Sequence, residues 1–300
     1  DRALANGIHY FDTAPHYGFG LSESRLGRGL ATQRAQLIIS SKVGRLLIPT
    51  NSSEPVRHSF VNAPAFEPVF NYSYDAVMRS FEASLQRLQT DYIDILFAHD
   101  LGSLTHGEEH ARHFRDFMEG GHRAMHELRA AGVVKAIGLG ANEWQVCEQA
   151  ITQGDFDCFL LAGRYTLLEQ GACESFLPLC GKRGVSIILG GPFNSGILAS
   201  GVNGAGPFYY NYEPAPRHII ERVAKLEAIC SDFSIPLAAA ALQFPLAHPQ
   251  VCSVVAGLAS PTQVEQSLVW MNHFIPQEFW HCLREQALIH PNAPAPTSIE

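Results

Sequence analysis

Seven short runs of apolar and β-branched residues recur along the chain, and segments with helical spacing separate them. Runs such as GIHYF, LIISSKV and DYIDILF are almost continuously apolar, which is typical of parallel strands buried on both faces. Segments such as YDAVMRSFEASLQRLQ and RHIIERVAKLEAICSDF repeat apolar residues at helical spacing. No linker rich in Pro, Ser or Gly interrupts this alternation. The pattern therefore predicts a single α/β domain over residues 1–300.

Eight strand–helix units would close a (β/α)8 barrel, and seven are visible here. The first residues, DRALANG, have the character of the end of a helix, so we expect the first barrel strand to lie upstream of residue 1. A doubly wound open sheet would need G-x-G-x-x-G after an early strand, and none stands there. We therefore predict the barrel. Residues 49–74 lack a helical period and are too long for a plain connection, which indicates an active-site loop.

Charge and cysteine content disfavour several classes of partner. The 300 residues carry a formal net charge of -8 and no basic stripe, which argues against nucleic acid and anionic membrane surfaces. The seven cysteines are scattered without a C-x-x-C pair, as expected for reduced thiols in a cytoplasmic protein. No apolar run has the length of a membrane span. We expect a monomer or a small homo-oligomer that binds a small molecule.

Polar residues follow the predicted strands at the ends that surround a barrel's active site. Lys42 is one of only four lysines, and burying it alone would be costly, so we expect Asp12 to neutralise it. A cation beside Tyr17 would lower the pKa of the phenol and make it a proton donor and acceptor near neutral pH. The strand-end set comprises Asp12, Tyr17, Lys42, His99, Asp100, Asn142, Arg164 and Tyr165.

Four motifs give the chain a resemblance to the aldo-keto reductase superfamily. They are GIHYFDTAPHYGFGLSESRLGRGL, SSKVGR, SLQRLQTDYIDILFAHD and NSGIL. The resemblance implies a catalytic tetrad of Asp12, Tyr17, Lys42 and His99 and a nicotinamide cofactor that carries the hydride. It further implies that Tyr17 exchanges the proton, Lys42 tunes Tyr17, Asp12 holds Lys42, and His99 orients the substrate oxygen.

The same resemblance implies that the cofactor's phosphates lie at the last strand and the following helix. There Ser260, Pro261 and Gln263 suit the N-cap, first and third positions of a helix, whose free N–H groups bind anions. Superfamily members specific for NADP usually place a Lys and an Arg where this chain has Gly257 and Gln263, so we expect NAD to be preferred. Two further positions depart from the family pattern, a glutamine that here is Ala162 and a stacking aromatic that here is Gly190. The cofactor-binding residues predicted in this way are Asn142, Gly190, Asn194, Gly257, Ser260 and Gln263.

Other segments, including AGRYTLLEQ and GGPFNSGIL, resemble the branch of D-threo-aldose 1-dehydrogenases, with L-fucose and L-galactose dehydrogenases. The resemblance implies NAD-dependent oxidation of the anomeric carbon of an aldose of the L-fucose, L-galactose or D-arabinose type to a lactone. The chain also resembles pyridoxal 4-dehydrogenase, which would form 4-pyridoxolactone from a ring stacked on Phe19, Phe66 or Phe70, and a general aldehyde or ketone reductase is a further alternative. We favour the aldose because the expected lining is mostly polar. Candidate substrate-binding residues are His16, Phe19, Asp100 and Arg164.

Three other interpretations compete. HGEEH at residues 106–110, followed by His113, matches a zinc-binding pattern, but Gly107 weakens a helix there and short motifs often match by chance, so no metal is expected. Lys42 could form a Schiff base as in a class I aldolase, which would leave Tyr17 and His99 without distinct roles. A barrel could also bind nucleotide without turnover.

Overall fold

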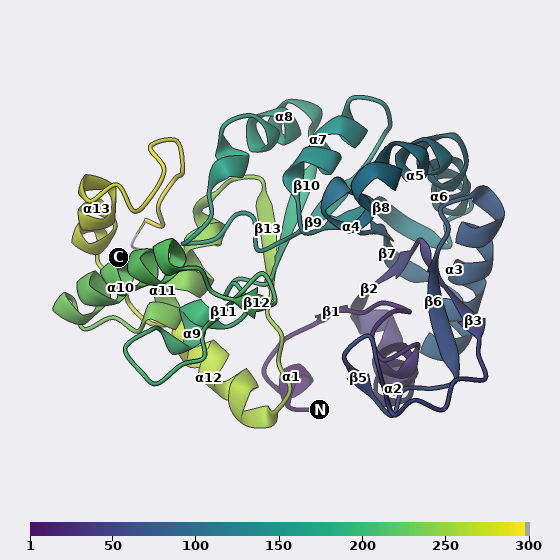
Figure 1. Ribbon diagram of the computed structural model, residues 1–300, viewed down its shortest axis with the longest axis horizontal. Coiled ribbons are helices and arrows are strands. Elements are labelled where there is room, and N and C mark those ends of the chain that lie inside the picture. The colour runs from purple at the N-terminus through teal and green to yellow at the C-terminus, as the bar shows by residue number, and fades with distance from the viewer. Residues whose placement is uncertain (298–300) are drawn as a thin grey trace. The chain divides into compact units, whose positions relative to one another are not determined.

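The computed structural model describes residues 1–297, which fall into two compact units with the boundary between Leu160 and Leu161. This boundary lies inside strand β9 (Cys158–Ala162), so no linker separates the units. The seven predicted strands are confirmed, together with the helices between them (Figure 1). The single domain over residues 1–300 remains a prediction.

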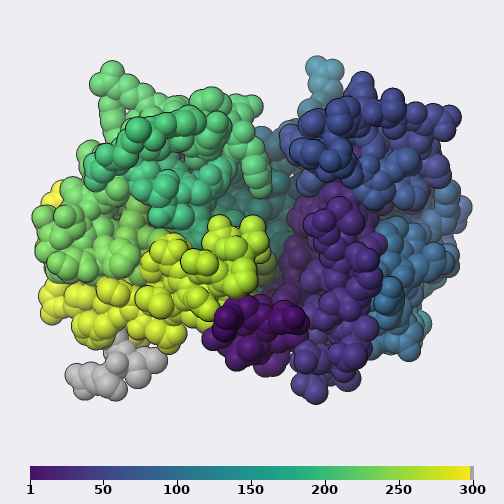
Figure 2. Space-filling view, turned by 90° about the horizontal axis from the view of Figure 1, so that it is seen from below, coloured from purple at the N-terminus to yellow at the C-terminus, as the bar shows by residue number. Residues whose placement is uncertain are grey.

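The first unit contains four parallel strands, their helices and the inserted hairpins. Its elements are α1 (Arg2–Ala5), β1 (Tyr10–Asp12), α2 (Leu21–Leu30), η1 (Ala31–Gln36), β2 (Ile38–Val43), β3 (Arg45–Pro49), β4 (Val56–Arg57), β5 (Phe60–Val61), β6 (Phe66–Phe70), α3 (Tyr74–Leu88), β7 (Ile93–His99), α4 (Ser103–His106), η2 (Gly107–Glu109), α5 (His110–Asp116), the π-helix η3 (Phe117–Gly121), α6 (His122–Ala130), β8 (Val134–Ala141) and α7 (Trp144–Ile151). Helix α1 buries none of its residues, and the N-terminal residues lie on the surface (Figure 2).

Strands β1, β2, β7 and β8 are neighbours in that order, and all three pairings are parallel. Helices α3 and α6 cover one face of these strands (Figure 1). Helix α3 begins where the Ser73 hydroxyl accepts a hydrogen bond from the N–H of Ala76, as an N-cap does, and it buries Val77, Phe81 and Leu88. Strands buried on both faces explain the continuous apolar runs in the sequence.

Residues 45–70, which include most of the predicted active-site loop, contain the four short strands β3, β4, β5 and β6. β3 pairs antiparallel with β6 from Arg45 opposite Phe70 to Pro49 opposite Phe66, and β4 pairs with β5 inside this hairpin. The role of residues 49–74 as an active-site loop stays a prediction. The sequence pattern hid the strands because they are short and half exposed, and residues 62–65 between them form a turn rich in small residues.

Arg57 anchors this segment from within. Its guanidinium donates to the carbonyl of Phe66 at 2.6 Å and to the carbonyls of Ala63 and Pro64, and it lies 4.9 Å from the centre of the Phe19 ring. A buried guanidinium is stable only when its N–H groups are satisfied. Arg57 therefore ties the β4–β5 hairpin to the turn that precedes β6.

The second unit contains two parallel strands, β10 and β13, that are neighbours. Its elements are η4 (Gly171–Cys173), α8 (Phe176–Arg183), β10 (Ser186–Gly190), α9 (Ile197–Ser200), β11 (Tyr209–Tyr210), β12 (Glu213–Pro214), α10 (Arg217–Asp232), α11 (Leu237–Gln243), η5 (Phe244–Ala247), β13 (Val251–Val255), α12 (Pro261–Met271) and α13 (Gln277–Glu285). Helices α11 and α12 pack together, as do α10 and α13.

Among residues 1–297, no single helix is both long and apolar enough to cross a membrane. In this described part of the chain, only α10 combined with residues 237–247 has the required length and composition, and these two helices are bent by 104° relative to each other.

Candidate active site

Asp12, Lys42 and His99 lie at the carboxyl ends of β1, β2 and β7, three adjacent parallel strands. The Lys42 Nζ donates to Asp12 Oδ2 at 2.6 Å and to the Thr13 carbonyl at 2.8 Å. The side chains of Lys42 and Asp12 are 2% and 8% exposed. The structure thus confirms that Asp12 neutralises a buried Lys42.

Tyr17 lies in the turn after β1, where its N–H donates to the Ala14 carbonyl at 3.1 Å. The Lys42 ammonium is 4.7 Å from the centre of its ring, and the His99 ring is 5.8 Å away at 87°. The four residues of the predicted tetrad therefore gather within the first unit.

The prediction of a lowered pKa for Tyr17 was wrong. Burial raises the pKa of Tyr17 above its usual value, and the charge of Asp12 adds to this, while Lys42 only opposes it. Burial alone would lower the pKa of Lys42, but the charges of Asp12 and Tyr17 raise it overall. The raised pKa keeps Lys42 protonated, whereas a Schiff-base mechanism needs a neutral amine.

Two hydroxyl groups that the sequence analysis overlooked support Asp12. Ser40 Oγ donates to Asp12 Oδ1 at 2.6 Å, and the Tyr10 hydroxyl lies 2.9 Å from Ser40 Oγ. Ser40 stands directly opposite Asp12 in the parallel register. Both carboxylate oxygens of Asp12 are therefore occupied. The serine pair in SSK was the signal for this contact, because Ser40 and Lys42 project to the same face of the strand.

His99 is neutral in this environment. Burial lowers the pKa of His99 well below its usual value, and the nearby cations Lys42 and Arg45 lower it further, as does His16. A neutral imidazole has one donor and one acceptor nitrogen. His99 can thus donate one hydrogen bond to a substrate oxygen, as its predicted role requires.

Asp100 does not have the open position expected of a substrate ligand. Its carboxylate forms an ion pair with Arg45 at the start of β3 and accepts from Asn142 Nδ2 at 3.1 Å. Arg45 in SSKVGR was not singled out as a site residue. Its position three residues after Lys42 was the available signal, but the reversal of the chain at Gly44 could not be foreseen.

Aromatic rings surround His16 beside the tetrad. Its ring centre lies 6.1 Å from those of Phe19 and His58 and 5.4 Å from that of Phe60, and 6.1 Å from that of His99. Burial, helped by Arg45 and His58, lowers the pKa of His16 to about 4. We call His16, Phe19, His58 and Phe60 the aromatic wall.

Three buried polar atoms in this area have no hydrogen-bond partner. They are His16 Nδ1, Arg45 Nε and His99 Nδ1, half of the six such atoms in the part of the chain that the structure describes. Buried polar atoms are nearly always satisfied in a folded protein. Their concentration beside Tyr17 fits a binding site in which oxygen atoms of a ligand supply the missing hydrogen-bond partners.

In the second unit, α12 begins as predicted. Ser260 is its N-cap and accepts from the N–H of Gln263 at 3.2 Å, and Pro261 is the first helical residue. The side chain of Gln263 turns back to accept from the N–H of Ala259 at 2.6 Å. A Cβ at Gly257 would meet nothing within 4 Å. The start of α12 therefore offers N–H groups suited to a phosphate without a side-chain cation at either position.

The other candidate residues of the second unit are engaged within it. The Asn194 amide accepts from Thr166 Oγ1 at 2.7 Å and donates to the Gly163 carbonyl at 3.0 Å, and the Gly190 carbonyl accepts from the N–H of Gly163 at 2.8 Å. Arg164 donates to Asn211 Oδ1 at 2.9 Å and to the Tyr210 hydroxyl at 3.3 Å. Arg164 thus fastens the β11–β12 hairpin, and its role as a substrate ligand remains a prediction.

HGEEH does not form one helix. Gly107, with φ of +52°, ends α4, and His110 begins α5 after a short 3₁₀ turn. His106 Nε2 lies 2.9 Å from the Tyr72 hydroxyl, and His110 Nδ1 lies 3.1 Å from the Leu101 carbonyl. Within residues 1–297 no group of three His, Cys, Asp or Glu residues is arranged to hold a metal ion.

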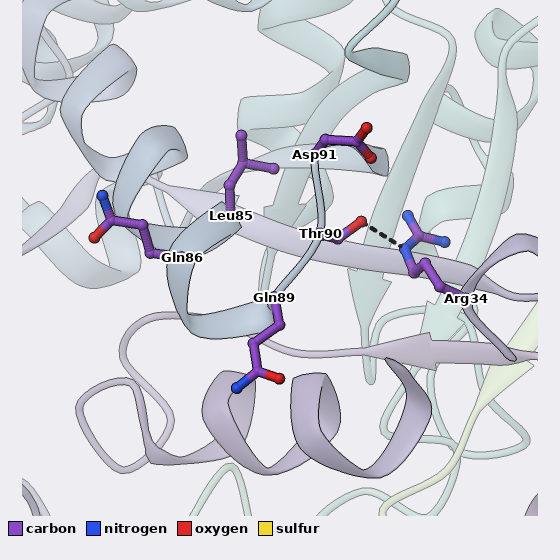
Figure 3. Close-up of a pocket in the computed structure, with 6 residues that line it drawn as sticks. All are labelled: Arg34, Leu85, Gln86, Gln89, Thr90 and Asp91. Carbon is purple, nitrogen blue, oxygen red and sulfur yellow. Dashed lines mark hydrogen bonds between the residues drawn. The ribbon is translucent and has the colours of Figure 1, made fainter. Parts of the chain in front are cut away.

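A surface hollow in the first unit lies apart from the tetrad (Figure 3). In it Arg34 Nε donates to Thr90 Oγ1 at 3.1 Å, and other groups of Arg34 donate to the carbonyls of Leu37 and Tyr92. Its lining consists of Arg34, Leu85, Gln86, Gln89, Thr90 and Asp91. Arg34 is thus already satisfied, and none of the predicted site residues lines the hollow.

The chain belongs to the aldo/keto reductase family, whose model matches residues 1–287. It is 46% identical over 294 residues to pyridoxal 4-dehydrogenase of Microbacterium luteolum, covering 95% of this chain and 85% of that protein. It is 37% identical over 295 residues to D-threo-aldose 1-dehydrogenase of a Pseudomonas species, covering 96% and 87%. These findings confirm the predicted family and its dehydrogenase branch.

Among solved structures, the holo form of an aldo-keto reductase from Bacillus halodurans is similar, with a TM-score of 0.75. That comparison covers 100% of this chain and 87% of the other at 24% identity. The family match and this similarity establish the predicted (β/α)8 fold class. The chain is accordingly an oxidoreductase of a family that uses a nicotinamide cofactor.

Proposed function

We propose that this protein oxidises the anomeric carbon of a cyclic hemiacetal to a lactone, with NAD as the hydride acceptor. The observation that carries the proposal is the buried cluster of Tyr17, Lys42 and Asp12 beside the neutral imidazole of His99. Both relatives described above are dehydrogenases by name. Their substrates share a hydroxyl-bearing anomeric carbon, so one site can serve either.

A bound nicotinamide would supply the acceptor for the hydride of the anomeric C–H bond. In its phenolate form, Tyr17 accepts the proton of the anomeric hydroxyl, and the C–O bond becomes the lactone carbonyl. Lys42 favours the phenolate form of Tyr17 and opposes the effect of its burial. His99 donates a hydrogen bond that fixes the substrate oxygen between its imidazole and Tyr17, and Asp12 keeps Lys42 in place.

For the substrate we propose the hemiacetal of pyridoxal, ahead of an aldose. An aldose would need a polar lining, yet the carboxylate of Asp100 is occupied by Arg45 and Asn142. The aromatic wall, in contrast, meets His99 through the ring of His16, and His16 and Phe60 are partly exposed whereas Phe19 is buried. Flat rings pack well on aromatic side chains, whereas a sugar needs many polar partners. The 46% identity to a pyridoxal 4-dehydrogenase supports the same choice.

An aldose of the L-fucose, L-galactose or D-arabinose type is the second candidate. The unpartnered polar atoms of His16, Arg45 and His99 could bind sugar hydroxyls. The 37% identity to a D-threo-aldose 1-dehydrogenase supports it.

A direct assay distinguishes the two. NADH absorbance is followed with pyridoxal, L-fucose, L-galactose and D-arabinose, using wild type, Tyr17→Phe and Phe60→Ala. We expect the highest kcat/KM with pyridoxal, and we expect Phe60→Ala to raise the KM for pyridoxal more than the KM for any sugar. Higher kcat/KM with a sugar would reverse the order, and no NADH from any of the four would refute the proposed reaction.

The preference for NAD is part of the proposal. Gly257 and Gln263 place no cation at the start of α12, so the 2'-phosphate of NADP would gain no charge-assisted contact. We expect kcat/KM to be higher with NAD than with NADP, and we expect the double substitution Gly257→Lys with Gln263→Arg to narrow that ratio. A higher kcat/KM with NADP in the wild type would contradict it.

The cytoplasm as location and a monomer or small homo-oligomer as the state of assembly complete the proposal. They are supported by the charge and cysteine pattern of the sequence. Fractionation and the mass of the protein in solution test them.

A further inference from the structure

An ion pair beside the tetrad has no part in the proposed proton transfer. Arg45 and Asp100 pair directly, and their side chains are 17% and 9% exposed. The Oδ1 of Asp100 accepts from Asn142 Nδ2 at 3.1 Å, while its Oδ2 lies 3.5 Å from His99 Nε2. One carboxylate therefore contacts a tetrad residue and the residue expected to bind the cofactor's carboxamide.

The backbone holds Asp100 in an uncommon conformation. Its φ is +47°, in the left-handed region that residues other than Gly seldom adopt, and its N–H donates to the Gly140 carbonyl at 2.8 Å. The Tyr72 hydroxyl donates to the neighbouring His99 carbonyl at 2.7 Å. Such conformations persist where the surroundings fix them and cluster at functional sites.

Arg45 reaches Asp100 because of Gly44. The φ of Gly44 is +99°, and a Cβ there would stand 2.3 Å from the Tyr72 ring. Any larger residue would push β3 away from Tyr72, and with it the Arg45 guanidinium, which lies 4.8 Å from the centre of the Phe70 ring. The pair thus depends on a close approach built into the chain.

Stability alone is a weak explanation for this pair. A buried ion pair can often be replaced by neutral groups at no loss of stability, although removing one partner is costly. Neutral replacements, however, would leave no fixed charge in contact with His99 and Asn142.

We propose that Arg45 and Asp100 form a positioning pair that orients His99 and Asn142 together. The pair would align the substrate oxygen with the nicotinamide ring. The inference rests on the proposed function in that hemiacetal oxidation is its main readout, but it holds for either hemiacetal.

A double-mutant cycle separates positioning from stability. The variants are Arg45→Met, Asp100→Asn and the two combined; Asn is chosen because it tolerates positive φ. We expect each single variant to lower both the melting temperature and kcat/KM, the latter by about 100-fold, as small misplacements at a reacting centre can do. In the double variant we expect the melting temperature to recover and kcat/KM to remain low. Recovery of both would show a purely structural pair and overturn the proposal.

The pH profile gives a second readout. The titratable or charged groups around His99 are Lys42, Arg45, His16, Tyr17 and Asp100. Losing the Arg45 cation should raise the pKa of His99 and move the acid limb of kcat/KM to higher pH. Losing the Asp100 charge should move it to lower pH. Shifts in the same direction, or no shift in either variant, would contradict the proposal.

Asp94→Asn is the matched control, because Asp94 also forms a buried ion pair, with Arg34 at 2.8 Å, but at the other end of β7. It should lower the melting temperature and leave the pH profile unchanged.

NADH binding, followed by fluorescence, distinguishes a failure of the inference from a failure of the proposed function. If the wild type oxidises no hemiacetal, the proposed function fails, and the inference is then decided by NADH: weaker binding in Asp100→Asn supports it, and equal binding overturns it.

Discussion

Strand β7 carries a charged cluster at each end, and the two clusters are built differently. At its start, Asp94 accepts from the N–H of Ile39 at 2.9 Å and from Lys135 at 2.7 Å, and it forms an ion pair with Arg34 at 2.8 Å. Arg34 in turn stacks 3.8 Å from the centre of the Tyr92 ring. No polar atom of this cluster is among the unsatisfied atoms of residues 1–297.

At the other end of β7, the cluster around His99 is incomplete. Asp12 and Lys42 are satisfied, but His99, His16 and Arg45 each have a buried nitrogen without a partner. A structural cluster closes on itself, whereas a binding site keeps unsatisfied groups for its ligand. The two ion-pair networks contain similar charges, and the presence of unsatisfied buried nitrogens distinguishes them.

Tyr17→Phe tests the incomplete end and should have the largest effect. Removing the proton acceptor should lower kcat by about 1,000-fold, because general acid–base catalysis contributes roughly 10²–10⁴-fold. The melting temperature should stay close to that of the wild type. Steady-state kinetics and calorimetry measure the two quantities. Full activity in this variant would remove Tyr17 from the catalytic assignment.

Asp94→Ala tests the closed end and should have a smaller, different effect. It leaves Arg34 without its buried partner and the N–H of Ile39 without an acceptor, so we expect the free energy of unfolding to fall by about 3 kcal/mol. Activity per folded molecule should change little. Denaturant unfolding and active-site titration give the two values. A large loss of kcat at normal stability would show that the Asp94 cluster, like the cluster around His99, serves catalysis.

The smallest expected effect is on the pH dependence of the free energy of unfolding, through His16 beside His99. The pKa of His16 is lowered to about 4 in the folded protein, against about 6.5 in an unfolded chain. Between these values the unfolded chain binds more protons, so the free energy of unfolding falls as pH drops from 6.5 towards 4. His16→Gln should flatten this dependence, and the exposed His281→Gln should not. Equal slopes in both variants would show that His16 is not the group responsible.

The sequence predicted those parts of the fold that rest on periodic apolar patterns. The seven strands and helices such as α3 and α10 follow directly from which residues are buried. The strands of residues 45–70 escaped because two short, half-exposed ladders leave little alternation to detect.

In the site, residues held by neighbouring strand ends were predictable, and residues brought in by a turn were not. Asp12, Lys42 and His99 follow from parallel register. Arg45 depends on the reversal at Gly44, and the aromatic wall depends on the path of the β4–β5 hairpin. The pKa of Tyr17 was misjudged because a sequence shows the neighbouring cation but not the depth of burial.

The Arg57 anchor also makes the β4–β5 hairpin a practical handle for protein engineering. The guanidinium binds the carbonyls of Ala63, Pro64 and Phe66, so one attachment of the hairpin lies outside its tip, and His58 at the tip adds an ion pair with Glu67. Phe60 and Val61 can be varied while Arg57 is kept, whereas the positive φ of His58 (46°) and Ser59 (67°) restricts which residues fit there. A library confined to Phe60 and Val61 would change one ring of the aromatic wall while the Arg57 contacts stay intact.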